Sequence, residues 1–329
     1  MKEKRCLISV EGRRISDRIL APYSFNIRSP NNRRSFLRFI SRLRYSSLVL
    51  RRRVVIDFHE CGLLHVPAML LFVSELDRIK RILKDNFDIG IENATNKIVN
   101  QTLHQVGVYK LCNVAKGDTD FDAFADSVRH WRYATGERVN EQTSKAFETI
   151  EGRLTPELAK GMWKSVSEAV VNSVEHAYVE ARGVDGPRMG HSRWWMFSQE
   201  KDDKLTVAVC DLGIGIPRSL PLNWQASMLQ KLRDTFSGEG PDSRSIRAAL
   251  EVGATSTSAS HRGKGLPQIW NTLRNVKGAS ISIMSNYGSL TWNGDDGEEF
   301  AHEHDTSIAG TLIIWTVASR SGAGLSNEG

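Results

Sequence analysis

The feature that most restricts the fold of this chain is a long helical segment with polar side chains on one face. Residues 155–181 read TPELAKGMWKSVSEAVVNSVEHAYVEA, in which Glu168, Asn172 and His176 follow one another at intervals of four residues. Side chains at this spacing project from one face of a helix, and Glu175 lies beside them. The opposite, apolar face consists of Val166, Ala169, Val170, Val174 and Ala177. The pattern predicts a helix that packs on one side and presents a polar cluster on the other.

A polar stripe of this kind forms either a buried hydrogen-bonded cluster or a functional site, and a second pattern favours the site. Residues 205–210, LTVAVC, are typical of a buried strand and lead directly into DLGIG, with Asp211, Gly213 and Gly215. A carboxylate at a strand end can accept a hydrogen bond from an exocyclic amine. Glycines let the backbone pass close to a flat ring. The segment therefore predicts a purine site.

Two further segments carry features of a nucleotide site. In HRGKGLPQIW, Gly263, Gly265 and Leu266 precede a predicted helix, where backbone N–H groups favour phosphate, and Lys264 adds positive charge. The segment AGTLIIWTV predicts a last strand that begins near Thr311. Each pattern alone is common, so the argument depends on their order along the chain. A Walker A motif, G-x4-G-K-[ST], is missing from the sequence, which excludes a P-loop nucleotide site.

The order of these motifs resembles the N, G1, G2 and final-strand boxes of the GHKL superfamily. This is the ATP-binding fold of gyrase, heat-shock chaperone, mismatch-repair protein and histidine kinase. The resemblance covers about residues 140–319, and SEAVVNSVEHAY is most similar to the anti-sigma-factor serine kinases. It implies a two-layer α/β sandwich, the Bergerat fold, that binds ATP with Mg²⁺. The predicted fold class of the chain is α/β of the α+β kind.

The resemblance also implies a role for each matching residue. Asn172 would hold Mg²⁺, Glu168 would orient or deprotonate the attacking nucleophile, and Asp211 would bind the adenine N6 amine. The other nucleotide-contacting positions implied are His176, Gly213, Gly215, Gly263, Lys264, Gly265, Leu266 and Thr311. Residues 218–262, between the second and third motifs, would form a lid that is mobile before nucleotide binds.

The N-terminal third differs from the rest in charge. Residues 1–55 hold 15 Lys and Arg against 3 Asp and Glu, a net charge of +12 in a chain whose total is +6. A predicted amphipathic helix over residues 31–47 buries Phe36, Phe39, Ile40 and Leu43 and carries the arginines Arg33, Arg34, Arg38, Arg42 and Arg44. Such a face is either solvated or a surface for nucleic acid or an acidic partner.

Residues 50–112 alternate between strands and helices. Residues 54–58 predict a strand, Pro67 begins a helix to about residue 82, and a further strand and helix follow. This segment resembles a STAS domain, the fold of anti-sigma-factor antagonists. The loop LLHVPAML lacks the Ser or Thr that this family phosphorylates, so the resemblance implies a docking or dimerising module without that regulation.

The predicted organisation has four parts. Residues 1–112 form a basic STAS-like docking domain, 113–139 a junction, 140–319 the ATP-binding domain and 320–329 a flexible tail. The longest apolar run is too short to span a bilayer, and the N-terminus lacks a signal-peptide core, so we expect a cytoplasmic protein. The four cysteines form no C-x-x-C pair, which argues against zinc and disulfides.

Three functions agree with these features. The first is an ATP-hydrolysing conformational switch that regulates a protein partner, which could be STAS-like or a second copy of the chain. The second is a serine/threonine protein kinase of the anti-sigma partner-switching type. The third is a nucleotide-gated adaptor that binds nucleic acid through its basic helix. A carboxylate at Glu168 favours the first two, because a binder without turnover has no need of a general base.

Overall fold

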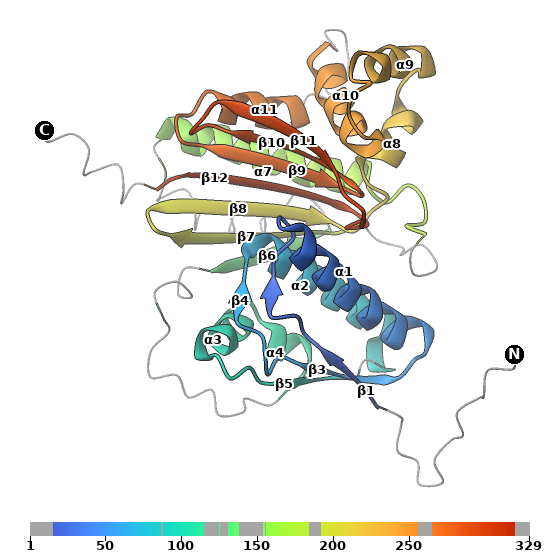
Figure 1. Ribbon diagram of the computed structural model, residues 1–329, viewed down its shortest axis with the longest axis vertical. Coiled ribbons are helices and arrows are strands. Elements are labelled where there is room, and N and C mark those ends of the chain that lie inside the picture. The colour runs from blue at the N-terminus through green and yellow to red at the C-terminus, as the bar shows by residue number, and fades with distance from the viewer. Residues whose placement is uncertain are drawn as a thin grey trace, which may run out of the picture.

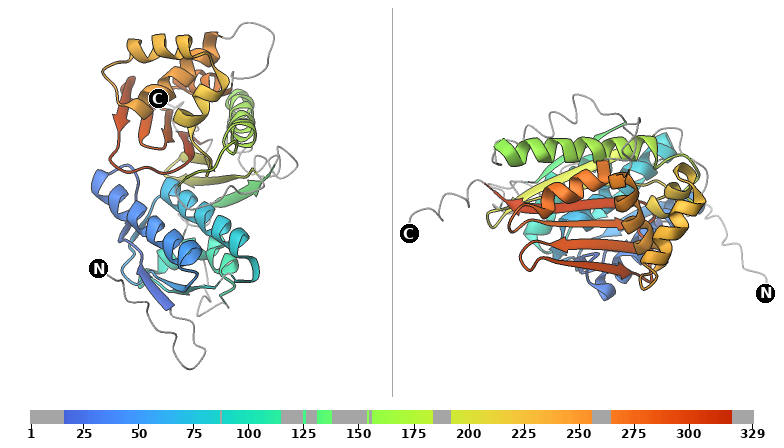
Figure 2. Two further views of the ribbon diagram at one scale, coloured as in Figure 1. Left: turned by 90° about the vertical axis from the view of Figure 1, so that its right-hand side faces the viewer. Right: turned by 90° about the horizontal axis from the view of Figure 1, so that it is seen from above.

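Two helices, α1 (Pro30–Arg44) and α2 (Val66–Leu83), lie side by side between two β-sheets (Figures 1 and 2). The structure is a computed structural model that describes residues 16–86, 88–114, 125, 131–137, 154, 156–183, 192–255 and 265–319. Its mixture of helices with parallel and antiparallel sheets agrees with the predicted α+β class.

The smaller sheet is parallel and has the strand order β1-β3-β5. Its strands are β1 (Ser16–Leu20), β3 (Arg53–Asp57) and β5 (Ile89–Glu92), and α1 and α2 are the crossover helices between them. A short parallel pair, β2 (Ser24–Phe25) with β4 (Leu63–Leu64), extends this unit. The shorter helical elements are η1 (Tyr45–Val49), η2 (Lys84–Asn86), α3 (Lys97–Gln105) and α4 (Val108–Leu111).

Helix α2 is buried along almost its whole length, including Ser74, Glu75, Asp77 and Arg78. A helix without a solvent-facing side must be covered all round, and α2 is enclosed by the two sheets and by α1. Its apolar side chains pack with a group of aromatic rings, Phe25, Phe36, Phe39, Phe58 and Phe72.

The larger sheet has seven strands in the order β11-β10-β9-β12-β8-β7-β6, and every neighbouring pair is antiparallel. The bounds are β6 (Arg132–Gly136), β7 (Trp194–Lys201), β8 (Lys204–Asp211), β9 (Ser280–Ser285), β10 (Gly288–Asn293), β11 (Glu298–Glu303) and β12 (Thr311–Ala318). The segment predicted as a junction thus supplies the edge strand β6.

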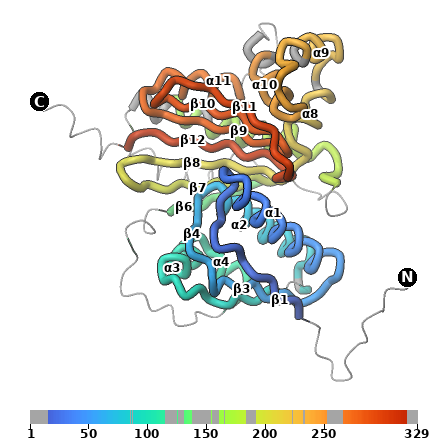
Figure 3. Tube along the Cα trace, in the orientation of Figure 1, coloured from blue at the N-terminus to red at the C-terminus, as the bar shows by residue number. Residues whose placement is uncertain are grey.

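Side chains on the central strands alternate between two buried faces. On β12, Ile313, Trp315 and Val317 face α7 (Pro156–Glu175), α10 (Pro241–Thr255) and α11 (Gly265–Arg274). Leu312 and Ile314 face α2 on the other side. Burial on both faces explains why strands such as TLIIWTV are almost continuously apolar. Figure 3 shows α1 and α2 next to this sheet.

The predicted helices and strands are largely confirmed, with two differences. Helix α7 ends at Glu175, because the carbonyl of Ala177 accepts a hydrogen bond of 2.7 Å from the N–H of Ile214 instead of continuing the helix. The predicted lid contains α8 (Ile216–Asn223) and α9 (Ala226–Thr235), but α10 belongs to the core, with Ile246 fully buried. The lid prediction is therefore wrong for α10.

None of the described helices is long and apolar enough to cross a membrane. The three described cysteines, Cys61, Cys112 and Cys210, are free and buried.

Candidate functional site

The ends of several elements meet at one end of the large sheet. Asp211, the last residue of β8, lies opposite Trp194 of β7 and Thr311 of β12. Thr311 in turn lies opposite Ser285, the last residue of β9. Helix α7 runs toward the same end, since the hydroxyl of Ser173 lies 3.4 Å from Asp211 Oδ2. The structure thus brings together three of the predicted regions, around Asn172, Asp211 and Thr311.

The carboxylate of Asp211 is buried, with 6% of the residue exposed. Its Oδ1 accepts a hydrogen bond of 2.9 Å from the N–H of Gly213. Loss of solvation raises the pKa of Asp211 to about 6, although hydrogen bonds from Gly213, Thr311 and Ser173 and the charge of Arg182 act in the opposite direction. A carboxyl group of this kind changes its charge just below neutral pH.

The predicted glycines lie where the backbone after β8 passes close to other segments. A Cβ on Gly213 would lie 2.1 Å from the carbonyl oxygen of Ala177, so the loop can rest against the end of α7 only without a side chain. Gly215 has a φ of +80° and would bring a Cβ within 2.5 Å of Asn286. Both glycines are therefore required by close contacts within the protein as well as being suited to a ligand.

The predicted stripe on α7 is half-buried at Glu168, Asn172 and His176. Within the described part of the chain, the side chains of Glu168 and Asn172 make no hydrogen bond or ion pair. His176 lies just beyond the helix, and its Nε2 is 3.9 Å from the carboxylate of Glu175. A carboxylate and an amide thus remain available on one face of α7.

The N-terminus of α11 points to the same end of the sheet. Helix α11 packs against α7, with a Cβ on Gly161 only 2.8 Å from Thr272 Cγ2. The following strand, β9, ends beside Thr311, so α11 must run away from the Asp211 end. Its first residues, Gly265 and the buried Leu266, therefore lie toward that end. The predicted phosphate-binding residues Gly263 and Lys264 lie outside the described residues.

Sequence reasoning missed several side chains that shape the site. The hydroxyl of Tyr178 accepts from the N–H of Leu212 and donates to the carbonyl of Arg193. Burial raises the pKa of this tyrosine. The side chain of Asn286 donates to the carbonyl of Ile214 over 2.8 Å. In the sequence, the only signal for Asn286 is its position in a turn, SNYG. The roles of Tyr178 and Asn286 could not be predicted because their hydrogen-bond partners are distant in sequence.

The basic helix α1 differs from its prediction. Arg33 is 1% exposed and donates to the carbonyls of Ile27 and Thr306, and burial lowers its pKa to about 10. Arg44 pairs with the buried Glu75 at 2.9 Å. Arg34 pairs with Asp305. Three of the five guanidinium groups thus have partners within the protein, and a fourth, that of Arg42, donates to the carbonyl of Arg18 over 3.5 Å. Arg38 makes no hydrogen bond or ion pair with a described residue.

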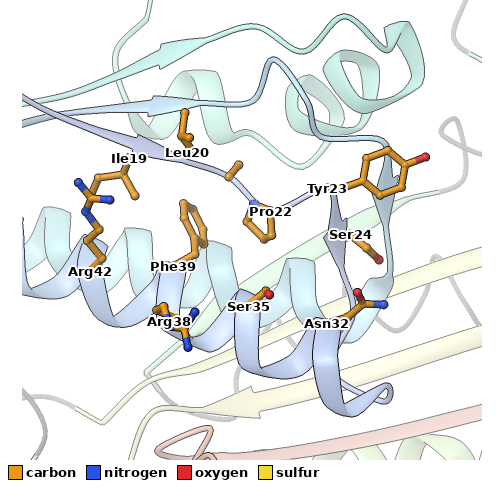
Figure 4. A pocket seen from close by; sticks show the side chains of 11 residues that line it. Ile19, Leu20, Pro22, Tyr23, Ser24, Asn32, Ser35, Arg38, Phe39 and Arg42 are labelled. Carbon is orange, nitrogen blue, oxygen red and sulfur yellow. The ribbon is translucent and has the colours of Figure 1, made fainter.

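A groove of about 370 Å³ lies between α1 and the chain from β1 to β2 (Figure 4). Arg38 and Arg42 line it together with Asn32 and Ser35, all on one side of α1. Leu20 and Tyr23, each 64% exposed, line the opposite side, and the buried Phe39 contributes to the groove as well. The groove combines positive charge with apolar surface.

Comparison with protein-family models, curated proteins and solved structures finds no match for this chain. Among the described residues, no three His, Cys, Asp or Glu side chains gather into a metal-binding cluster.

Proposed function

We propose that the end of β8 is an ATP site and that the chain hydrolyses ATP with Mg²⁺ as a conformational switch of the GHKL type. The observation that carries the proposal is the buried carboxylate of Asp211, held at a strand end by Gly213 and Ser173. Helix α7 places Asn172 directly before Ser173, with Glu168 one turn earlier. Asn172 and Glu168 therefore lie on the helix that reaches Asp211, which is the neighbourhood that the resemblance to the GHKL motifs leads us to expect.

The side chains present suit the proposed ligands. Asp211 offers an acceptor to the adenine amine, and burial strengthens that hydrogen bond. The amide oxygen of Asn172 is a hard ligand of the kind that Mg²⁺ prefers, and it has no partner among the described residues. Bound ATP and Mg²⁺ supply the phosphoryl-transfer chemistry. Glu168, four residues from Asn172 on the same face, would take the proton of the attacking hydroxyl.

The nature of that hydroxyl separates the switch from the kinase. Water gives an ATPase, and a serine or threonine of a partner protein gives a protein kinase, with the same residues in the same roles. The structure favours the nucleic-acid adaptor least, because Arg33 and Arg44 of the basic helix are engaged inside the protein.

Three substitutions test the proposed site. Asp211→Asn presents an amide donor to the adenine amine and should weaken ATP binding by roughly 10- to 100-fold, measured by calorimetry. Glu168→Ala should retain binding and lose turnover by ~10²-fold or more. The matched control is Glu175→Ala on the same helix, whose carboxylate is 53% exposed and should not matter. Wild-type protein that binds no adenine nucleotide would refute the proposal.

We also propose that a partner protein binds in the groove beside α1. Residues 16–57 contain ten arginines and two aspartates, and the aspartates are paired with Arg18 and Arg52. Arg38 makes no ion pair with a described residue. Within the described residues, β1 pairs only with β3, so its other edge can accept a strand. An extended acidic peptide with apolar side chains matches these features.

Selection from a library of random linear peptides displayed on phage tests this surface. Wild-type protein should enrich peptides in which Asp or Glu flank apolar residues, and Arg38→Glu/Arg42→Glu should abolish the enrichment. Arg51→Glu/Arg53→Glu makes the same change of charge outside the groove and should preserve it. An oligothymidylate that binds wild-type protein with a steep salt dependence, without any acidic peptide enriched, would identify nucleic acid as the occupant instead.

A further inference from the structure

A buried group of charges connects α2 to the segment before β12. Glu75 of α2 is fully buried, and its Oε1 accepts from Arg182 Nη2 at 2.5 Å and from Arg44 Nη1 at 2.9 Å. Loss of solvation acts to raise the pKa of Glu75, but the charges of Arg182, Arg44 and Arg78 and the hydrogen bond from Arg182 outweigh it and lower the pKa to about 2. Glu75 is therefore an ionised carboxylate at neutral pH, held between one arginine of α1 and one that follows α7.

Arg182 also contacts the segment before β12, next to the proposed ATP site. Its Nε donates to the carbonyl of Ala309 over 2.5 Å, and 8% of the arginine is exposed. Ala309 precedes Gly310 and Thr311, and a Cβ on Gly310 would lie 2.3 Å from the carbonyl oxygen of Asp211. The segment that Arg182 holds thus touches the residue proposed to bind adenine.

We infer that Glu75 is a positioning residue of the proposed ATP site. Through it the N-terminal unit, which consists of the parallel sheet β1-β3-β5 with α1 and α2, holds the start of β12 against Asp211. The inference rests on the proposed function for its ligand and on the contacts of Glu75 and Arg182 for its geometry. Without the carboxylate, Arg182 retains its charge in a buried place and loses the anchor that α2 provides. The guanidinium would move, and with it the carbonyl of Ala309 and the backbone of Thr311.

A purely structural role for Glu75 would have a different signature, and Asp77 supplies the control. Asp77 lies two residues further along α2, is 6% exposed, and accepts from Trp195 Nε1 at 3.0 Å. It therefore joins the same helix to the same sheet. Its hydrogen-bond and ion-pair partners among the described residues are Trp195 of β7, Arg193 and, on α2 itself, Arg81, and do not include Arg182 or Ala309. Loss of either carboxylate should destabilise the interface, but only loss of Glu75 should disturb the start of β12.

The experiment compares Glu75→Gln with Asp77→Asn in the full chain. Urea unfolding measures stability, calorimetry measures ATP affinity in the native state, and amide hydrogen exchange reports on Gly310 and Thr311 without nucleotide. We expect Glu75→Gln to weaken ATP binding by on the order of 10-fold and to accelerate exchange at those amides. Asp77→Asn should lose comparable stability with ATP affinity unchanged within about twofold.

Each outcome has a distinct meaning. Equal exchange and equal affinity in the two variants would overturn the positioning role of Glu75. Faster exchange in Glu75→Gln alone, in a protein whose wild type binds no nucleotide, would refute the proposed function while supporting the contact between α2 and β12. If Glu75→Gln does not fold, Glu75→Asp keeps the charge with a shorter reach, and its affinity should lie below that of wild type.

Discussion

Asp211 is a carboxyl group whose burial opposes its ionisation. Its pKa in the folded protein is about 6, against 3.8 for a free side chain, and loss of solvation is the main cause. The folded state therefore holds this proton at pH values where the unfolded chain has released it. As the pH rises from about 4 to about 6, the contribution of Asp211 to the free energy of unfolding falls.

The raised pKa of Asp211 leads to the first prediction. Asp211→Asn removes the titrating group, so its stability relative to wild type should improve by about 2 kcal/mol as the pH rises from about 4.5 to about 7. Urea unfolding of both proteins at the two pH values measures the change. The other carboxyl groups titrate in both proteins, so their effects on stability cancel in the comparison. One of them is Glu75, whose lowered pKa adds stability that is lost in acid. A difference that is independent of pH would contradict the burial of an ionisable Asp211.

At the scale of elements, the contact between α7 and α11 fixes where the proposed phosphate-binding turn begins. Gly161 in α7 allows the close approach, because an added Cβ would lie 2.8 Å from Thr272 Cγ2. Alanine favours a helix by ~1 kcal/mol over glycine. Overpacking against a stiff, β-branched threonine costs about 1–3 kcal/mol. The two effects have opposite signs, and we expect the steric cost to exceed the gain.

Thermal unfolding of a double-mutant cycle tests this packing. Gly161→Ala should lower the midpoint, whereas Gly161→Ala in the background of Thr272→Ala should raise it, since the methyl group in conflict is gone. The same cycle should show ATP affinity falling with Gly161→Ala and recovering in the double variant. Additive effects of the two substitutions would mean that the helices do not meet at these residues.

Much of each element could be predicted from the sequence. The strand that ends at Asp211, the last strand that begins at Thr311 and the helix with Glu168 and Asn172 all have strong local patterns: apolar runs, a helical period and a following glycine. Local pattern also singled out candidate residues that the structure brings to one end of the sheet, and their roles stay a prediction. The helix and the strands could be predicted because they depend on neighbours within a few positions.

The remaining features depend on contacts between distant residues. The buried orientation of Arg33 follows from the carbonyl of Thr306, 273 positions away, and that of Arg44 from Glu75. The sequence does not reveal these acceptors, and an arginine on an amphipathic helix is then expected to be exposed. The end of α7 at Glu175 likewise depends on Ile214, and the place of α10 depends on the sheet beneath it. A single sequence carries no signal for any of these pairs.

At the scale of the whole molecule, the N-terminal unit is one of the two layers that cover the large sheet. One hydrophobic core runs from Phe36 and Leu71 to Trp195, Phe197 and Ile314. The sequence suggested that residues 1–112 form a docking domain separate from the ATP-binding domain. The shared core changes that expectation, because removing residues 1–112 would expose an apolar sheet face and leave Arg182 without Glu75.

A shared core predicts that the two parts unfold together, and the chain contains natural probes for each. All eight tryptophans lie between residues 131 and 315, so their fluorescence reports on the larger sheet and its helices. In a Cys6→Ser/Cys210→Ala variant, the remaining thiols are the buried Cys61 and Cys112 of the N-terminal unit. Burial raises the pKa of both to about 12, which keeps them unreactive until they are exposed.

We expect urea to give one midpoint for tryptophan fluorescence and for the labelling of these two thiols. Because the interface buries apolar side chains from both parts together with the ion pair of Glu75 and Arg182, neither part can open without exposing the other's core. Glu75→Gln should move both midpoints down together. Thiol labelling that precedes the fluorescence change would show that residues 1–112 form a separable domain, and residues 113–329 should then be soluble and bind ATP alone.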